Sequence, residues 1–302
     1  MGTRQVLAGA LAAALLAAPA ADAADPGRWQ LTKARKVKIA YNQGITAVGS
    51  SAFSFSSNQI IFLTDRALRQ RRENTQILPA DVVSAEGYDH IGDLTYDRAE
   101  GGRLLLPLEC YRPGAPGGGN HCGTGSIGVA SPSTLDWRYY VKLDPRDIKK
   151  AMWAETSPDG RSLWTQAGSV LLRYDMREIT RANAAPTGKV LRPVQRLRRA
   201  LPPGQMTGAT FVGDRLFVAT QPDTMRVYSI DLRTGKRRLE IERAIRGESE
   251  GLATLRTANG TLHWQIAPFD PKGRTPTYGA DNGAASVRTK PPIKLSSQGR
   301  TL

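Results

Sequence analysis

The chain has 302 residues and 40% of them are hydrophobic, which excludes a chain without a core and allows one large domain or two smaller ones. The 30 glycines and 19 prolines indicate many turns. The formal net charge of +15 favours anionic partners by long-range attraction, and it is equally well explained as a soluble, self-repelling surface.

The first residues are organised like an export signal. Arg4 supplies positive charge, residues 6–18 form an uncharged run rich in alanine and leucine, and Ala21-Asp22-Ala23 is a small-x-small cleavage site. The apolar run is shorter than the roughly 20 residues that cross a bilayer. We therefore predict a cleaved signal peptide over residues 1–23, a secreted protein, and no transmembrane segment after cleavage.

A strand-like pattern first appears after residue 35. Residues 24–35 are polar and are predicted to be irregular, whereas residues 36–41 begin by alternating charged and apolar side chains, as a half-buried strand does. Five similar modules follow, each with a short opening of small residues and then a second, apolar strand. The openings are residues 42–46, 90–94, 153–157, 206–210 and 249–253, and the second strands are residues 59–63, 103–107, 162–165, 215–219 and 261–265.

The modules repeat at similar intervals. If the equivalent positions are Gly44, Gly92, Glu155, Gly208 and Gly251, the intervals are 48, 63, 53 and 43 residues. Four-stranded modules at roughly this period are typical of a β-propeller, whereas a single β-sandwich rarely repeats so regularly. We predict an all-β propeller over residues 36–279 with five blades, or six if residues 31–41 combine with the segment after Trp264. Residues 36–41 are the predicted strand that pairs into the last blade and closes the ring.

The C-terminal part departs from this pattern. Few apolar residues remain after residue 279, so residues 280–302 are predicted to form a basic, disordered tail. The third and fourth strands of the last module are not evident. We expect a monomer.

The two cysteines are Cys110 and Cys122. In an oxidising compartment they are predicted to form a disulfide that closes the loop of residues 111–121. The alternative is a metal site with His121 as a third ligand, but two cysteines rarely suffice for structural zinc.

Two short strings resemble bacterial secreted propellers. Residues 157–164, Ser-Pro-Asp-Gly-Arg-Ser-Leu-Trp, resemble the turn of WD-like, TolB-type repeats, and residues 247–252 are similar to the Glu-Gly-Leu opening of phytase-like and esterase-like propellers. The strings His90-Ile91-Gly92-Asp93 and Met-Trp-Ala-Glu-Thr-Ser-Pro-Asp-Gly, residues 152–160, together resemble an uncharacterised family of secreted propellers over roughly residues 36–279. The resemblance implies the fold, and this fold serves both enzymes and binding proteins.

The openings are expected to converge on the axis of the ring, because the first strand of each propeller blade lies innermost. The polar residues that they would bring together are Gln43, His90, Asp93, Glu155, Thr207 and Glu250. Converging carboxylates repel each other unless a cation or a shared proton joins them, so Asp93, Glu155 and Glu250 are a tentative calcium site. The alternative is that Asp93 and Glu250 accept hydrogen bonds from backbone N–H groups.

Two functions remain open. The first is non-catalytic binding of a small ligand or an anionic envelope polymer, and the basic runs 66–72 and 192–199 are either polyanion contacts or solvated faces. The alternative is a metal-dependent hydrolase of lactones or phosphoesters, with His90 as general base and Asp93 beside it as the tentative catalytic pair. A histidine that only forms hydrogen bonds near the axis is the simpler explanation. Export and the lack of interleaved aromatic residues argue against nucleic acid as a partner.

Overall fold

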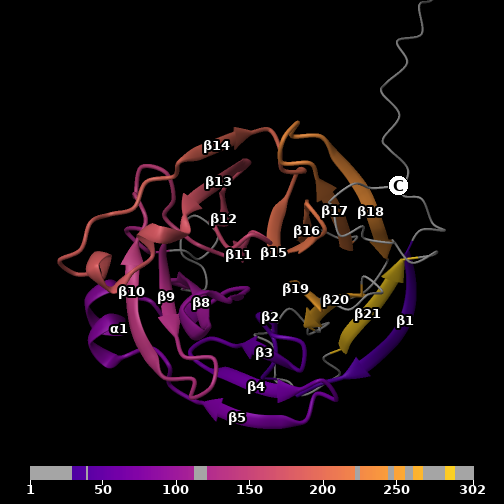
Figure 1. Ribbon diagram of the computed structural model, residues 1–302, viewed down its shortest axis with the longest axis horizontal. Coiled ribbons are helices and arrows are strands. Elements are labelled where there is room, and N and C mark those ends of the chain that lie inside the picture. Colours follow the sequence, from indigo (N-terminus) through magenta and orange to yellow (C-terminus); the bar gives the residue numbers. More distant parts are fainter. Residues whose placement is uncertain are drawn as a thin grey trace, which may run out of the picture.

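Five antiparallel sheets surround one axis (Figure 1). The computed structural model describes residues 29–38, 40–111, 121–221, 225–243, 248–255, 261–267 and 283–289. The chain is therefore an all-β propeller, as predicted, and the described residues form five blades.

Each blade runs from an innermost strand at the axis to an outermost strand at the rim (Figure 1). In this order, the first blade contains β2 (Gly44–Val48), β3 (Ala52–Ser56), β4 (Ile61–Asp65) and β5 (Gln70–Asn74). The second contains the short inner strands β6 (His90–Ile91) and β7 (Thr95–Asp97), then β8 (Arg103–Glu109), β9 (Ser126–Ala130) and β10 (Trp137–Lys142). The third contains β11 (Glu155–Thr156), β12 (Ser162–Ala167), β13 (Val170–Asp175) and β14 (Gln195–Arg198).

The last two blades have the same four-stranded plan. The fourth contains β15 (Gln205–Val212), β16 (Arg215–Gln221), β17 (Met225–Ile230) and β18 (Arg237–Arg243), and the fifth contains β19 (Glu248–Leu255), β20 (Thr261–Ala267), β21 (Gly283–Thr289) and β1 (Trp29–Lys36). The described helices are α1 (Ala80–Glu86), which precedes the second blade, and short 3-10 turns at Ala99–Gly101, Met176–Glu178 and Arg181–Asn183.

An N-terminal strand closes the ring, but it is not the predicted one. The closing strand is β1, Trp29–Lys36, so residues 29–35 are not irregular. Trp29 anchors it, because the buried indole donates a hydrogen bond to Glu240 at 3.1 Å and lies 5.6 Å from the ring of Phe217 in the fourth blade. The predicted segment instead turns toward the axis, since the backbone N–H of Tyr41 bonds to Lys38, and Tyr41 stacks on Phe55.

The predicted disordered tail, residues 280–302, contains a strand. β21 pairs with β20 on one side and with β1 on the other, so it is the third strand that the last module lacked. Its residues, Gly-Ala-Ala-Ser-Val-Arg-Thr, carry little apolar surface, and backbone hydrogen bonds on both edges give no signal in a hydrophobic pattern. Residues 290–302 and the predicted signal peptide, residues 1–23, lie outside the described residues.

The first blade also differs from prediction in one strand. Residues 59–63, predicted as its second strand, belong mostly to the third strand, β4, and the second strand is β3, Ala-Phe-Ser-Phe-Ser. The serines of β3 are buried because their hydroxyls are satisfied. Ser54 donates to the carbonyl of Phe62 at 2.9 Å and Ser56 to the carbonyl of Gly92 at 2.8 Å. Because of these serines, a buried core strand looks like a polar segment in the sequence.

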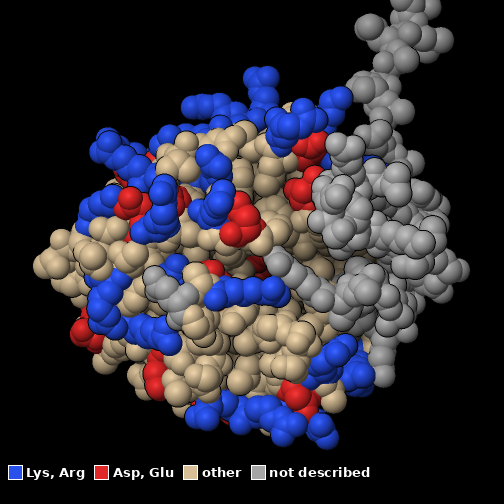
Figure 2. Space-filling view, viewed as in Figure 1, with Lys and Arg blue, Asp and Glu red and all other residues tan. Residues whose placement is uncertain are grey.

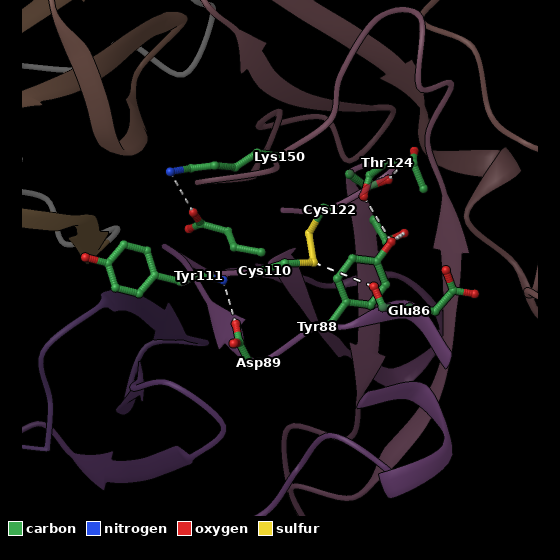
Figure 3. Close-up of a disulfide and its surroundings, with 11 residues drawn as sticks. Glu86, Tyr88, Asp89, Cys110, Tyr111, Cys122, Thr124 and Lys150 are labelled. Carbon is green, nitrogen blue, oxygen red and sulfur yellow. Dashed lines mark hydrogen bonds and ion pairs between the residues drawn. A yellow bond between two sulfur atoms is a disulfide. The ribbon is translucent and has the colours of Figure 1, made fainter. Parts of the chain in front are cut away.

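The predicted disulfide is confirmed. Cys110 and Cys122 are bonded, and their Cα atoms are 5.1 Å apart (Figure 3). Cys110 directly follows β8, and both cysteines are buried in the hydrophobic cluster of the second blade.

Candidate functional site

Asp93 lies on the axis between β6 and β7 and joins all the blades. Its carboxylate accepts backbone hydrogen bonds from Ile45 at 2.9 Å, Ala209 at 3.0 Å and Leu252 at 3.2 Å, which belong to the first, fourth and fifth blades. Its own backbone bonds to Met152 and Ala154 at the start of the third blade. One fully buried residue, 0% exposed, thus connects its own blade to the other four, three through its side chain and one through its backbone.

Glycines let the inner strands approach this carboxylate. A Cβ atom added at Gly44 would lie 2.6 Å from the Cα atom of Asp93, and one at Gly208 or Gly251 would lie 2.8 or 2.7 Å from its carboxylate oxygens. Real Cβ atoms do not approach so closely. The repeated glycines therefore close the axis around Asp93, and the central channel expected from the sequence is blocked at this level.

Asp93 consequently acts as a structural residue. Burial raises its pKa well above the usual range, while the three N–H groups favour the ionised form. Both oxygens are engaged by backbone groups, which is the alternative considered for Asp93 in the sequence. The tentative catalytic and metal-binding roles of Asp93 therefore have no support in its geometry.

His90 lies three residues before Asp93, at one end of the axis. Its Nε2 is 2.6 Å from Oε1 of Gln43 in the first blade. Because a carbonyl oxygen only accepts, this contact places the proton on Nε2 and leaves a lone pair on Nδ1. Burial, together with the charge of Lys150, lowers the pKa of His90 to about 4. The imidazole is thus neutral near pH 7.

A buried ion pair lies beside this histidine. Glu109 is directly opposite His90 in the pairing of β6 with β8, and its carboxylate is 3.2 Å from Nζ of Lys150. Burial raises the pKa of Glu109 to about 7, although Lys150 opposes the shift. Sequence analysis missed both residues, since only the register of the two strands reveals that Glu109 faces His90.

Two further glutamates come from the fifth blade. Burial is the largest cause of the raised pKa of Glu250, and the charges of Glu248 and Glu109 add to it. Burial is also the largest cause of the raised pKa of Glu248, and a side-chain hydrogen bond couples the two carboxyl groups. The raised pKa values favour the protonated form of this pair.

The disulfide places an aromatic ring at this end of the axis. Tyr111 follows Cys110 directly, and its backbone N–H donates to Asp89 at 2.7 Å. The ring is 47% exposed and its centroid is 5.8 Å from that of His90. Figure 3 shows Tyr111 and Lys150 on one side of the disulfide, with Glu86 and Thr124 on the other. We refer to Gln43, His90, Glu109, Tyr111, Lys150, Glu248 and Glu250 as the axial cluster.

Glu155 lies on the opposite side of Asp93. It accepts a hydrogen bond from Thr95 at 2.7 Å and weaker ones from Thr210 and from the backbone of Phe211. Thr95 follows Asp93 by two residues whereas His90 precedes it by three, so an extended strand separates Glu155 from the axial cluster.

The predicted site residues are thus divided. The structure brings Gln43, His90 and Glu250 together, and it places Glu155 elsewhere. Thr207 is buried, and its hydroxyl donates to Ser249 at 3.4 Å.

The calcium prediction finds no common site in the described part of the chain. No group of three or more His, Cys, Asp or Glu side chains is arranged there to hold a metal ion. The closed axis at Asp93 separates Glu155 from Glu250. His263, which is half-buried, packs edge-on against Phe53 with 4.7 Å between ring centroids, between the fifth and first blades.

Comparison with known proteins supports the fold alone. No protein-family model matches the chain, and no curated protein is significantly similar in sequence. Among solved structures, glutaminyl cyclase of Myxococcus xanthus is 10% identical with a TM-score of 0.54, over 86% of this chain and 97% of that one. A luciferin-regenerating enzyme is 14% identical with a TM-score of 0.48, covering 82% of this chain and 76% of that one. Regucalcin of Agrobacterium tumefaciens, a calcium-binding protein, is 16% identical with a TM-score of 0.45, with the same coverage.

The likeness to the glutaminyl cyclase supports the β-propeller fold alone, and it assigns no family. Among the described residues, no helix is both long and apolar enough to cross a membrane.

Proposed function

We propose that the protein binds a small polar ligand at the axial cluster. The observation that carries this proposal is the gathering of ionisable side chains from separate blades beside an exposed aromatic ring, at the end of a closed axis. The cluster offers a lone pair on His90, a proton shared by the coupled carboxyl groups of Glu248 and Glu250, and an ammonium group on Lys150. These groups suit a ligand with both donors and acceptors, and Tyr111 supplies a face for stacking.

Thermal shift and calorimetry measure this binding with a panel of sugars, nucleosides, amino acids and lactones. A ligand of the axial cluster is expected to stabilise the wild type and to lose at least tenfold in affinity in Tyr111→Ala and Glu109→Gln. Glu155→Gln, at the opposite end of the axis, is the matched control and should bind normally. Equal loss in the control, or unchanged binding in both cluster variants, would refute the proposed site.

A hydrolase is the second candidate, and one observation favours it. The pKa of His90 is lowered to about 4 while that of Glu109 is raised to about 7, so a neutral base and a carboxyl group that titrates near neutrality lie side by side. His90 Nδ1 would take a proton from water, and Glu109 would protonate the leaving oxygen. Turnover of lactones and phosphoesters is measured with added calcium and with chelator. Hydrolysis that survives Glu109→Gln with an unchanged pH profile would exclude this assignment.

An exported protein fits these observations. The disulfide is of a kind that persists in oxidising compartments, and it holds the residue that follows it at the cluster. The anionic polymer suggested by the net charge does not suit the axial cluster, because Glu109, Glu248 and Glu250 would repel it at high pH. Such a partner would have to contact the rim of the ring.

A further inference from the structure

The segment from Val190 to Arg198 runs along the rim from the second blade to the third, because Leu191 forms a parallel bridge with Leu143 and residues 195–198 form β14, the outer strand of the third blade. Leu191 is buried and Leu197 packs on the core, while the residues between and beside them are exposed at every second position. This alternation places one set of side chains on the outward face of an extended chain. That outward set is Val190, Arg192, Val194, Arg196 and Arg198. We call these five residues the rim stripe.

The valines of the rim stripe are unusual on this surface. Val190 is 45% exposed and Val194 is 57% exposed, and Tyr111 is the one other large hydrophobic residue exposed to this degree among the described residues. Arginines on an outermost strand are explained as protection of a sheet edge against pairing. The two valines precede β14 and belong to no strand, so this explanation does not apply to them. Together with the arginines they form a surface that is both apolar and cationic.

The arginines are held in place by acidic residues below them. Arg196 bonds to Asp147 at 2.8 and 2.7 Å, and Arg192 lies 3.3 Å from Asp144 with 71% of its side chain exposed. Arg198 and the adjoining Arg199 are exposed and form no ion pair within the described residues. Figure 2 shows lysine and arginine side chains gathered along the edge of the ring, including the part over β14.

We propose that the rim stripe docks on the surface of an anionic phospholipid bilayer. Cationic and apolar side chains alternate along roughly 26 Å of extended chain. Arginines can bind the phosphates of lipid headgroups while the valines between them reach the boundary of the acyl chains. A soluble anionic polymer would engage the arginines only and would leave both valines in water, so the lipid surface fits the whole stripe.

Vesicle co-sedimentation tests this inference with the purified protein. Vesicles of phosphatidylglycerol and phosphatidylcholine are expected to bind at least tenfold more tightly than vesicles of phosphatidylcholine alone. The double variant Val190→Ser/Val194→Ser keeps every charge, and its affinity for the anionic vesicles should fall about tenfold. The affinity of Arg192→Gln/Arg198→Gln should fall further. Arg71→Gln/Arg72→Gln on β5 removes the same charge elsewhere on the rim and should stay within twofold of the wild type.

Two results would overturn the inference. One is the absence of a preference for phosphatidylglycerol. The other is binding that the valine substitutions leave unchanged and that soluble polyphosphate abolishes, which would identify a polymer site. Melting temperatures of all variants within about 2 °C of the wild type establish that each change in binding is local.

Discussion

The carboxylate of Asp93 and the backbone N–H of Leu252 are separated by 159 positions in the sequence and by 3.2 Å in the structure. The same carboxylate bonds to two further blades, so its loss affects several interfaces at once. We expect Asp93→Asn to lower the free energy of unfolding by about 1–3 kcal/mol, because one amide oxygen cannot serve three donors and each unsatisfied buried donor is costly. Denaturant titration measures the change. Asp159→Asn, in an exposed turn, should cost much less, and an equal effect would contradict this role of Asp93.

Close packing around the axis gives a second prediction. A Cβ atom at Gly251 would lie 2.6 Å from the backbone nitrogen of Ile45, where the chain has little freedom to move. Gly251→Ala is therefore expected to lower the melting temperature strongly or to prevent folding. At Gly123 a Cβ atom meets nothing within 4 Å, so Gly123→Ala is the control and should melt near the wild type. Similar melting of the two variants would show that the axis is not closed by contact.

The axial cluster should make stability depend on pH. Because the folded pKa of His90 is lowered to about 4 from 6.5, the unfolded chain binds more protons between these values, and His90 contributes stability that rises with pH across this window. Glu109 has a folded pKa raised to about 7 from 4.5, so its contribution falls as pH rises between these values. Denaturant titrations at several pH values measure how the free energy of unfolding changes with pH. Compared with the wild type, it should rise less steeply with pH in His90→Gln and more steeply in Glu109→Gln. The reverse order would refute these assignments.

The disulfide joins cysteines that are 12 positions apart in the sequence, so its removal is expected to lower the free energy of unfolding by about 3 kcal/mol. The variant Cys110→Ser/Cys122→Ser, compared with the wild type under oxidising conditions, measures the effect. Reducing agent should destabilise the wild type and leave the double variant unchanged. A reductant effect on the double variant would locate the sensitivity elsewhere.

The fold could be predicted from the sequence where it depends on short, local sequence signals. The turn at Ser157–Gly160 is one such local signal, and the glycines at Gly44, Gly92, Gly208 and Gly251 mark the inner strands of four of the five blades. The role of Asp93 had no such signal, because the alignment of the modules placed Gly92, and not Asp93, at the equivalent position. The second strand of the first blade was missed because the sequence does not show that the hydroxyl groups of Ser54 and Ser56 form hydrogen bonds inside the core.

The candidate site could be predicted from the sequence only in part. Gln43, His90 and Glu250 belong to repeated openings, and this placed them correctly at the axis. Glu109 and Lys150 belong to no repeat, and they reach His90 through strand register and through a connection between blades. Glu155 was assigned to the same site because the sequence cannot show that Asp93 blocks the axis between the two ends.

The fifth blade takes its third strand from the end of the described chain and its fourth strand from the beginning. A chain that emerges vectorially, from a ribosome or through a translocation pore, can form the first four blades as it appears, but it cannot close the ring until Gly283–Thr289 has emerged. A nascent protein that ends before this point presents β20 and Trp29 without their strand partner. Export in an unfolded form is thus compatible with the topology, because completion is delayed until nearly the whole chain is on the far side.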